Sequence, residues 1–154
     1  MSHSGISLRR ELIEQVSSHY FDLIKVHDFK KAFEYLTNTN LINIDDIGES
    51  KVLLTLLDPL VHNLSDLDLN AQSLVLTSTG STYAALSEYQ NALEHYEKAL
   101  EIARHIGDNL SESNTLRNIG SAYAVLGVYR KALDHYEKAL EIARQIEDKR
   151  GEGG

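Results

Sequence analysis

The sequence contains no cysteine among its 154 residues. This absence excludes disulfides, thiolate metal sites, iron–sulfur clusters and cysteine nucleophiles, and it fits a reducing compartment. The chain does not open on a basic segment followed by an apolar run, so export is not predicted. No stretch approaches the roughly 20 apolar residues of a membrane span. Together these absences predict a cytoplasmic protein that does not enter a membrane.

Positive charge is also scarce. The chain has 15 Lys and Arg residues against 23 Asp and Glu residues, which gives a formal net charge of −8. A surface of this sign repels the phosphates of nucleic acids and the headgroups of anionic membranes. Neither is therefore expected as a partner, and the charge by itself does not identify one.

Helix-breaking residues are few, with one proline and nine glycines in the chain. Good helix formers, above all Ala, Leu, Glu and Lys, are abundant in the second half. A chain of this length suits one compact domain or a short solenoid, and it buries about 70% of its unfolded surface without needing a disulfide or a metal. The composition therefore predicts an all-α protein.

The second half of the sequence is a tandem duplication. The segment 80–109 aligns with the segment 120–149 at an offset of 40 residues, and about two-thirds of the aligned positions are identical. Each copy reads as two helices joined by a tight turn. In the second copy we predict one helix from about Glu112 to Leu126, a break at Gly127, and another helix from about Tyr129 to Ile146.

Small and aromatic residues recur at the same places in both copies. Gly80 and its copy let the two helices of a pair approach closely, and Ala92 and its copy do the same from the other side. Ala99 and its copy are expected to face the helix of the next repeat. A helix pair that buries only one face must stack on a further pair, which builds a solenoid. The positions that define the repeat are Gly80, Tyr83, Ala92, Tyr96, Ala99, Gly120, Tyr123, Ala132, Tyr136 and Ala139.

The run from Leu116 to Leu140, read as Leu-x-x-Ile-Gly-x-x-Tyr-x-x-Leu-Gly-x-Tyr-x-x-Ala-Leu-x-x-Tyr-x-x-Ala-Leu, resembles the tetratricopeptide repeat. The common repeat has 34 residues, so this 40-residue form has longer helices. It is similar to the arrays of kinesin light chains, of G-protein-modulator adaptors, and of bacterial signalling proteins that join a nucleotide-switch ATPase or a caspase-like domain to repeats. The resemblance covers about Leu74 to Gly153. Residues that depart from the usual pattern are Thr79, Ser87, Arg104 and Arg144.

This resemblance implies a right-handed α-solenoid of antiparallel helix pairs with about seven to eight helices. We divide the chain into a diverged helical cap of degenerate repeats (1–68), two repeats (69–108 and 109–148), and the start of a linker (149–154). Because 148–153 aligns with the segment between the two copies, we expect either that the array continues in a longer protein or that the last helix self-associates.

The first half shows weaker signals of the same architecture. Apolar residues at helical spacing, followed by a degenerate copy of the turn, predict a helix pair over 8–36. Residues 38–49 are predicted to be a loop. A further helix is expected over 51–64, and Pro59 either kinks it or begins a new helix capped by Asp58.

The resemblance also implies a concave groove, lined by the first helix of each pair, that binds a protein or peptide. Asn118 lies where related families place an asparagine that bonds the backbone of a bound peptide, and Arg117 beside it suits an acidic side chain or a carboxylate. The competing interpretation is that Asn118 packs locally and Arg117 is solvated. The candidate partner-binding residues are Asn114, Arg117, Asn118, Ser121, Val125, Thr77, Ser78, Ser81 and Ala85.

Other candidate sites are weaker. His95 and His135 recur with the repeat and lie beside carboxylates, but repetition alone explains them, so no metal site is predicted. The run Asp66-x-Asp68-x-Asn70 lacks the later glycine and glutamate of a calcium loop, so we reject that interpretation and expect the segment to cap the next helix. No nucleophile–base arrangement or phosphate loop appears. We therefore predict no cofactor and no catalytic activity.

Two functions remain open. The first is a scaffold or adaptor module that binds a protein or peptide in its groove. The alternative is the sensor or regulatory arm of a larger bacterial signalling protein, in which the repeats detect a trigger and release an effector domain. An enzyme is the least supported class.

Overall fold

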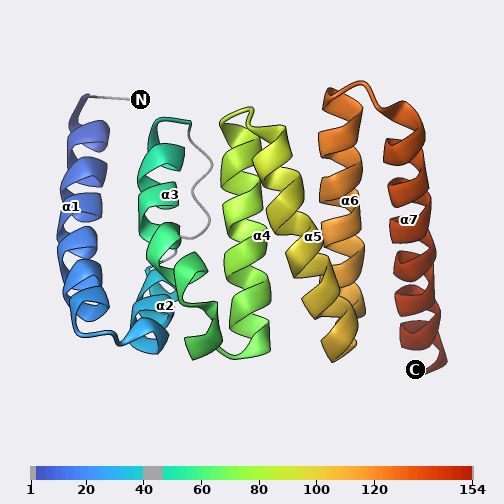
Figure 1. The fold of residues 1–154 in the computed structure, drawn as a ribbon, viewed down its shortest axis with the longest axis horizontal. Helices are drawn as coiled ribbons and strands as arrows, with labels where there is room; N and C mark the ends of the chain where they lie inside the picture. Colours follow the sequence, from blue (N-terminus) through green and yellow to red (C-terminus); the bar gives the residue numbers. More distant parts are fainter. Residues whose placement is uncertain (1–2, 40–46, 154) are drawn as a thin grey trace.

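The computed structural model describes residues 3–39 and 47–153, and in that part of the chain it contains helices and turns but no strand. Seven α-helices follow one another, with a short 3-10 helix η2 before the fourth (Figure 1). The prediction of an all-α chain is therefore confirmed. The helices are α1 (His3–Lys25), α2 (Phe29–Asn38), α3 (Ile47–His62), α4 (Leu69–Ala85), α5 (Tyr89–Ile106), α6 (Asn109–Val125) and α7 (Tyr129–Glu152), and η2 spans Leu64–Asp66.

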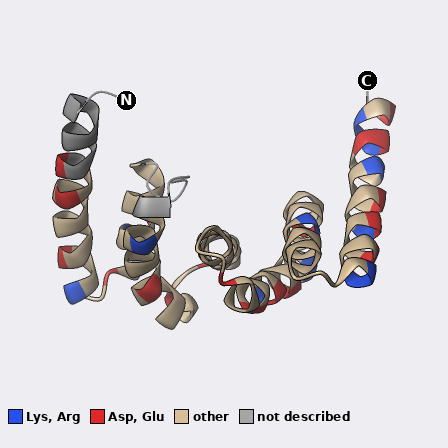
Figure 2. Cartoon of the chain, turned by 90° about the horizontal axis from the view of Figure 1, so that it is seen from above, with Lys and Arg blue, Asp and Glu red and all other residues tan. Residues whose placement is uncertain are grey.

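The helices are arranged as a solenoid. Successive helices pack against each other, most extensively α4 with α5 and α6 with α7, and α5 packs on α6 to join the two copies. Seen from above, the chain forms an open arc with α1 and α7 at its ends, with α4 and α6 toward the inner side and α5 on the outer side (Figure 2). The first helix of each repeat therefore lines the concave side.

Each tight turn between paired helices contains one residue with positive φ. These residues are His27 (φ 57°), Ser87 (φ 61°) and Gly127 (φ 76°). The three turns also share the hydrogen bond that the next residue's backbone N–H donates back to the helix, as from Glu88 to the carbonyl of Tyr83. The same kind of turn therefore joins α1 to α2 and joins the two helices of each clear copy. This confirms the predicted helix pair in the first half.

Close packing within each repeat depends on a missing side chain. A Cβ atom built at Gly80 would lie 2.7 Å from the ring of Tyr96, and one at Gly120 would lie 2.9 Å from the ring of Tyr136. Both distances are shorter than van der Waals contact allows, so the tyrosine of the second helix occupies the space that a side chain on the first would need.

Two hydrophobic clusters stabilise the arc. The first joins α1, α2, α3 and the start of α4, with Tyr20, Leu36 and Leu57 fully buried. The hydroxyl of Tyr20 donates a hydrogen bond to the backbone carbonyl of Leu56. The second cluster joins α5, α6 and α7, with Leu116 and Ile119 at its centre. Each cluster thus joins helices of more than one pair, and the core is not confined to one repeat.

Ala139 is buried in the cluster that contains Leu116 and Ile119 of α6. The hydroxyl of Ser113 on α6 also donates a hydrogen bond to the backbone carbonyl of Ala139 at 2.9 Å. Small size at this position therefore allows the two helices of one pair to meet. The expectation that this alanine also faces the helix of the next repeat stays a prediction.

Pro59 lies inside the continuous helix α3. The alternative that a new helix begins at Asp58 is wrong, and α3 already begins at Ile47, four residues before the predicted start. The predicted loop falls largely on 40–46, outside the described residues. Asp68 caps α4 by accepting a hydrogen bond from the backbone N–H of Ala71. This confirms the expectation that the segment caps the next helix.

Two helix boundaries in the second copy also differ from the prediction. Helix α6 begins at Asn109 rather than Glu112, because Asp108 caps it from one residue earlier. Helix α7 continues to Glu152, beyond the predicted end near Ile146, so 149–152 are helical. The reason is local: α5 ends at Gly107 in the left-handed conformation, whereas Glu147 occupies the equivalent position in α7.

Among the described residues, no helix has both the length and the apolar character needed to cross a lipid bilayer.

Candidate partner-binding site

The candidate residues lie on the two inner helices of the arc, α4 and α6. On α6, Asn114, Arg117, Ser121 and Val125 are exposed and Asn118 is half-buried. On α4, the predicted side chains are smaller. The half-buried ones are Thr77 and Ser78, and the exposed ones are Ser81 and Ala85.

Two of the predicted residues also have a structural role. The hydroxyl of Tyr96 donates to Ser81 Oγ at 3.1 Å, and the hydroxyls of Ser121 and Tyr136 lie 2.9 Å apart. Burial raises the pKa of Tyr96, and the contact with Ser81 opposes this only in part. Both serines therefore contact the tyrosine of their own repeat, which is buried in the first copy (Tyr96) and exposed in the second (Tyr136), and this leaves Arg117 as a freer group.

Arg117 is the one guanidinium among the predicted residues. Its Nη2 lies 3.4 Å from the Oδ1 of Asn114, which is long for a hydrogen bond, and both side chains are exposed. A contact of this length on an exposed helix face contributes little, so a partner would displace it at small cost.

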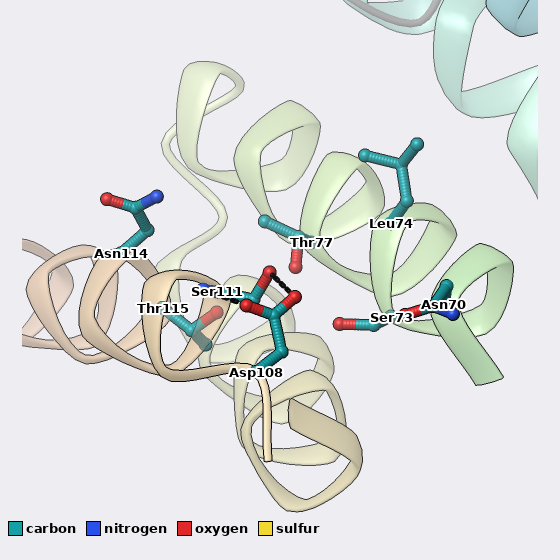
Figure 3. A pocket seen from close by; sticks show the side chains of 8 residues that line it. All are labelled: Asn70, Ser73, Leu74, Thr77, Asp108, Ser111, Asn114 and Thr115. Carbon is teal, nitrogen blue, oxygen red and sulfur yellow. Dashed lines mark hydrogen bonds between the residues drawn. The ribbon is translucent and has the colours of Figure 1, made fainter. Parts of the chain in front are cut away.

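Between α4 and α6 lies a recess of about 250 Å³, which we call the inter-helix recess (Figure 3). Most of its lining residues are polar, with four hydroxyls, two amides and one carboxylate beside a single leucine. The lining residues are Asn70, Ser73, Leu74, Thr77, Asp108, Ser111, Asn114 and Thr115. Sequence reasoning named Asn114 and Thr77 as candidate binding residues but did not name Asp108, Ser111 and Thr115. The signal was present: several of these positions are apolar in the first copy and polar in the second.

Asp108 provides the carboxylate of the inter-helix recess. It accepts hydrogen bonds from the backbone N–H of Ser111 at 3.0 Å and from the Ser111 hydroxyl at 2.6 Å (Figure 3). The Ser111 hydroxyl, and then its backbone N–H, hold the pKa of Asp108 below the usual value. The group is therefore an anion at neutral pH, with acceptor capacity left for a further donor.

Thr115 contributes a buried hydroxyl without a partner. Its side chain is 1% exposed, and its Oγ1 atom makes no hydrogen bond. Burying an unsatisfied hydroxyl costs about 1–3 kcal/mol. The equivalent residue of the first copy is Val75, which has nearly the same shape, is equally buried and has no polar atom. Packing therefore does not require the hydroxyl at this position.

The recurring histidines are engaged locally. His95 and His135 each place Nδ1 within 2.8 Å of a carbonyl one turn earlier, and their rings stack on Tyr83 and Tyr123 at 5.2 and 5.5 Å. No cluster of three or more metal-binding side chains occurs in the described part of the chain. Repetition and packing account for the pair.

Charge is sparse on the inner helices. Helix α4 contains no charged residue, and α6 contains only Glu112 and Arg117 (Figure 2). Glu112 is already paired with Arg104 of α5 at 2.8 Å. The acidic balance of the chain therefore lies mostly on other helices, and Asp108 is an isolated anion beside the inner face.

Helix α7 exposes an apolar stripe at the end of the arc, which we call the end surface. Leu133 is 57% exposed, whereas the equivalent Leu93 of α5 is 5% exposed because α6 packs over it. The contrast indicates that this face of the second helix of a repeat is the face on which a following helix packs. The end surface consists of Tyr129, Leu133, Tyr136 and Leu140.

Comparisons with known proteins agree with this geometry. The chain is similar in fold to a signal transduction ATPase with numerous domains from Pyrococcus horikoshii that has a tetratricopeptide repeat sensor, with a TM-score of 0.53 and 22% identity over 90% of this chain. It spans only 25% of that protein's length. A crystal structure of MamA gives a TM-score of 0.46 and 17% identity, covering 88% of this chain and 81% of MamA.

No curated protein matches the sequence. A family model described as "Tetratricopeptide repeat" matches residues 72–145, which include most of α4 through α7. Together with the helix-pair architecture, this match shows repeats of the tetratricopeptide type over residues 72–145.

Proposed function

We propose that this chain is a protein-interaction module that binds a protein or peptide partner on the inner face of α4 and α6. The observation that supports this best is the exposed polar set on α6. Arg117 and Asn114 are held only by a long mutual contact of 3.4 Å, so their donors and acceptors are available to a partner.

The two copies contribute unequally to this face. Asn118 offers an amide that both donates and accepts, which suits the backbone of an extended peptide. Arg117 suits an acidic side chain or a terminal carboxylate, and Val125, 63% exposed, adds an apolar contact. The first copy has only the small residues Thr77 and Ser78 at the equivalent positions. We therefore propose that α6 provides most of the binding free energy.

The test uses peptides selected on the full chain from a random display library, with affinity measured by calorimetry. We expect Asn118→Ala and Arg117→Ala each to weaken binding about tenfold, or about 1.4 kcal/mol. Glu97→Ala is the matched control, because Glu97 is exposed on the outer helix α5 and should not change affinity. Unchanged affinity in both inner-face variants, or an equal loss in the control, would show that partners bind elsewhere.

The alternative function is a sensor or regulatory arm within a larger signalling protein. The observation that favours it is the fold similarity to a protein whose repeats are described as a sensor. An antibody to this segment, applied to a native lysate, distinguishes the two functions. A species near 17.3 kDa supports an autonomous adaptor, whereas a much larger species supports the sensor arm.

The end surface of α7 gives a second contact, and we propose that a second copy of the chain covers it. Its four apolar side chains form a stripe flanked by charges of both signs, so two stripes pack without net repulsion. The equivalent stripe of α5 is already buried by a helix, which indicates that this face is suited to helix packing.

We propose no catalytic activity and no cofactor for this chain. The inner face offers amides, hydroxyls and one guanidinium, and in the described residues no nucleophile is paired with a base there. Location in the cytoplasm stays a prediction from the absence of cysteine.

A further inference from the structure

Three polar residues of the inter-helix recess arise from differences between the two copies. The equivalents of three of its lining residues on α6, Ser111, Asn114 and Thr115, are Ala71, Leu74 and Val75 on α4. All three differences replace an apolar side chain by a polar one, and all three lie in the same wall. The cap is unchanged, since Asp68 in the first copy and Asp108 in the second both accept the N–H of the residue three positions later.

The chemistry of this wall favours a cation. Asp108 is ionised, accepts hydrogen bonds from the backbone N–H and the hydroxyl of Ser111, and is not contacted by a Lys or Arg among the described residues. Thr115 lines the same recess, and its buried Oγ1 atom makes no hydrogen bond (Figure 3). A carboxylate and an unpaired hydroxyl facing one small cavity offer acceptors to a charged donor, whereas an anion would meet Asp108.

We propose that the inter-helix recess binds a positively charged side chain of the partner, with Asp108 as the counter-ion and the Thr115 hydroxyl as a second acceptor. This inference rests on the proposed inner-face function and specifies part of the partner's chemistry. A lysine or an arginine has the required charge, and the net charge of −8 attracts such segments at long range.

The test is an NMR titration of the full chain with small probes, so it does not depend on identifying the partner. The probes are the N-acetyl N-methylamides of lysine and arginine, with the Nε-acetylated lysine derivative as the neutral control. We expect both cationic probes to shift the amide signals of Asp108, Ser111 and Thr115, with dissociation constants on the order of millimolar. The tighter probe identifies which side chain the recess prefers.

Three variants test the residues. Asp108→Asn retains a good helix cap but removes the charge, and it should weaken the cationic probes about tenfold. Asp68→Asn makes the same change at the cap of the other copy, and it should leave their affinity unchanged. Thr115→Val removes only the hydroxyl, and because Val75 already packs in this way it should weaken binding about threefold with no loss of thermal stability.

Three outcomes would overturn the proposal: shifts spread over acidic surface residues, equal losses in the two aspartate variants, or equal binding of the neutral derivative. The variants Asn118→Ala and Arg117→Ala serve as a separate readout. If they leave selected peptides unaffected while the cationic probes still bind the recess, the inner-face function fails and the cation site stands. If the peptides depend on them but the probes do not bind, only the cation site fails.

Discussion

At the scale of single residues, equivalent tight turns place different residue types in the left-handed conformation. Ser87 adopts φ 61° where Gly127, its equivalent, adopts φ 76°. A residue with a Cβ atom pays about 1–2 kcal/mol for the left-handed conformation, which glycine avoids at some cost in unfolded-state entropy. Ser87 therefore introduces a backbone strain at its turn that the turn at Gly127 does not have.

We predict that Ser87→Gly stabilises the chain by about 0.5–1 kcal/mol in urea unfolding. The reciprocal control is Gly127→Ser, which should destabilise it by a similar amount. Ser87→Ala tests the backbone explanation, since alanine removes the hydroxyl but keeps the Cβ atom and should give no gain. A larger gain from alanine than from glycine would refute the strain argument.

The glycine at position 120, inside helix α6, is constrained by packing rather than by backbone conformation. Alanine is normally the better helix former by about 1 kcal/mol. At Gly120, however, a Cβ atom would lie 2.9 Å from Tyr136 and 3.1 Å from the carbonyl of Ala132. We predict that Gly120→Ala destabilises the chain by about 1–3 kcal/mol because the helix pair must separate.

The matched control is Gly151→Ala, because Gly151 is also helical but has open space around its Cβ position. This variant should be neutral or stabilising by up to about 1 kcal/mol. Thermal and urea unfolding measure both variants. If Gly120→Ala is as stable as the control, the close approach does not constrain the repeat.

At the scale of the helix, the caps give stability a dependence on pH. The pKa of Asp108 is lowered in the folded chain, first by the Ser111 hydroxyl and then by the Ser111 backbone N–H. A lowered folded pKa means that the unfolded chain binds the proton more readily. The contribution is therefore complete above the ordinary value of 3.8 and is lost as pH falls through the lower folded value.

We predict that Asp108→Asn reduces the fall in melting temperature as the pH drops below about 4, because asparagine caps the helix without titrating. Near neutral pH the variant should be almost as stable as the parent chain. Calorimetric scans across this range provide the measurement. An unchanged pH dependence would mean that other carboxylates dominate the acid transition.

The length of α7 is also decided by one residue. Gly107 ends α5 in the left-handed conformation, whereas Glu147 occupies the same place in α7 and the helix continues to Glu152. We predict that Glu147→Gly ends the helix near Ile146, so that the helical ¹³Cα shifts of 149–152 disappear. Glu147→Ala should preserve these shifts, and a loss in both variants would indicate fraying rather than a specific stop.

At the scale of the whole molecule, the arc ends in an apolar surface. Tyr129 is 73% and Leu133 57% exposed on this surface. We predict that the chain sediments with a concentration-dependent mass and that the double variant Leu133→Gln, Leu140→Gln is monomeric. Glu137→Gln, on the same helix, is the control and should still associate. A monomeric parent chain at high concentration would remove self-association as the role of this surface.

The sequence by itself determined the local features of this protein. Helical periodicity, the 40-residue duplication and the turn at Gly127 predicted the helix pairs of the second half, because each depends on residues close together in the chain. The paired positions Gly80 and Gly120 likewise implied close packing, which the short distances to the tyrosine rings confirm. The diverged first pair was also predictable, because its turn is a degenerate copy of the later turn in sequence. The structure shows the same turn geometry.

Only the tertiary structure decided which equivalent residues are covered and which are free. Leu93 and Leu133 occupy equivalent positions in similar local sequences, yet one is buried by α6 and the other is exposed at the end of the arc. The inter-helix recess arises in the same way, because Asp108 and Thr115 acquire a common cavity only when α6 packs beside α4. Burial depends on which neighbour lies across the helix, and one-dimensional periodicity does not contain that information.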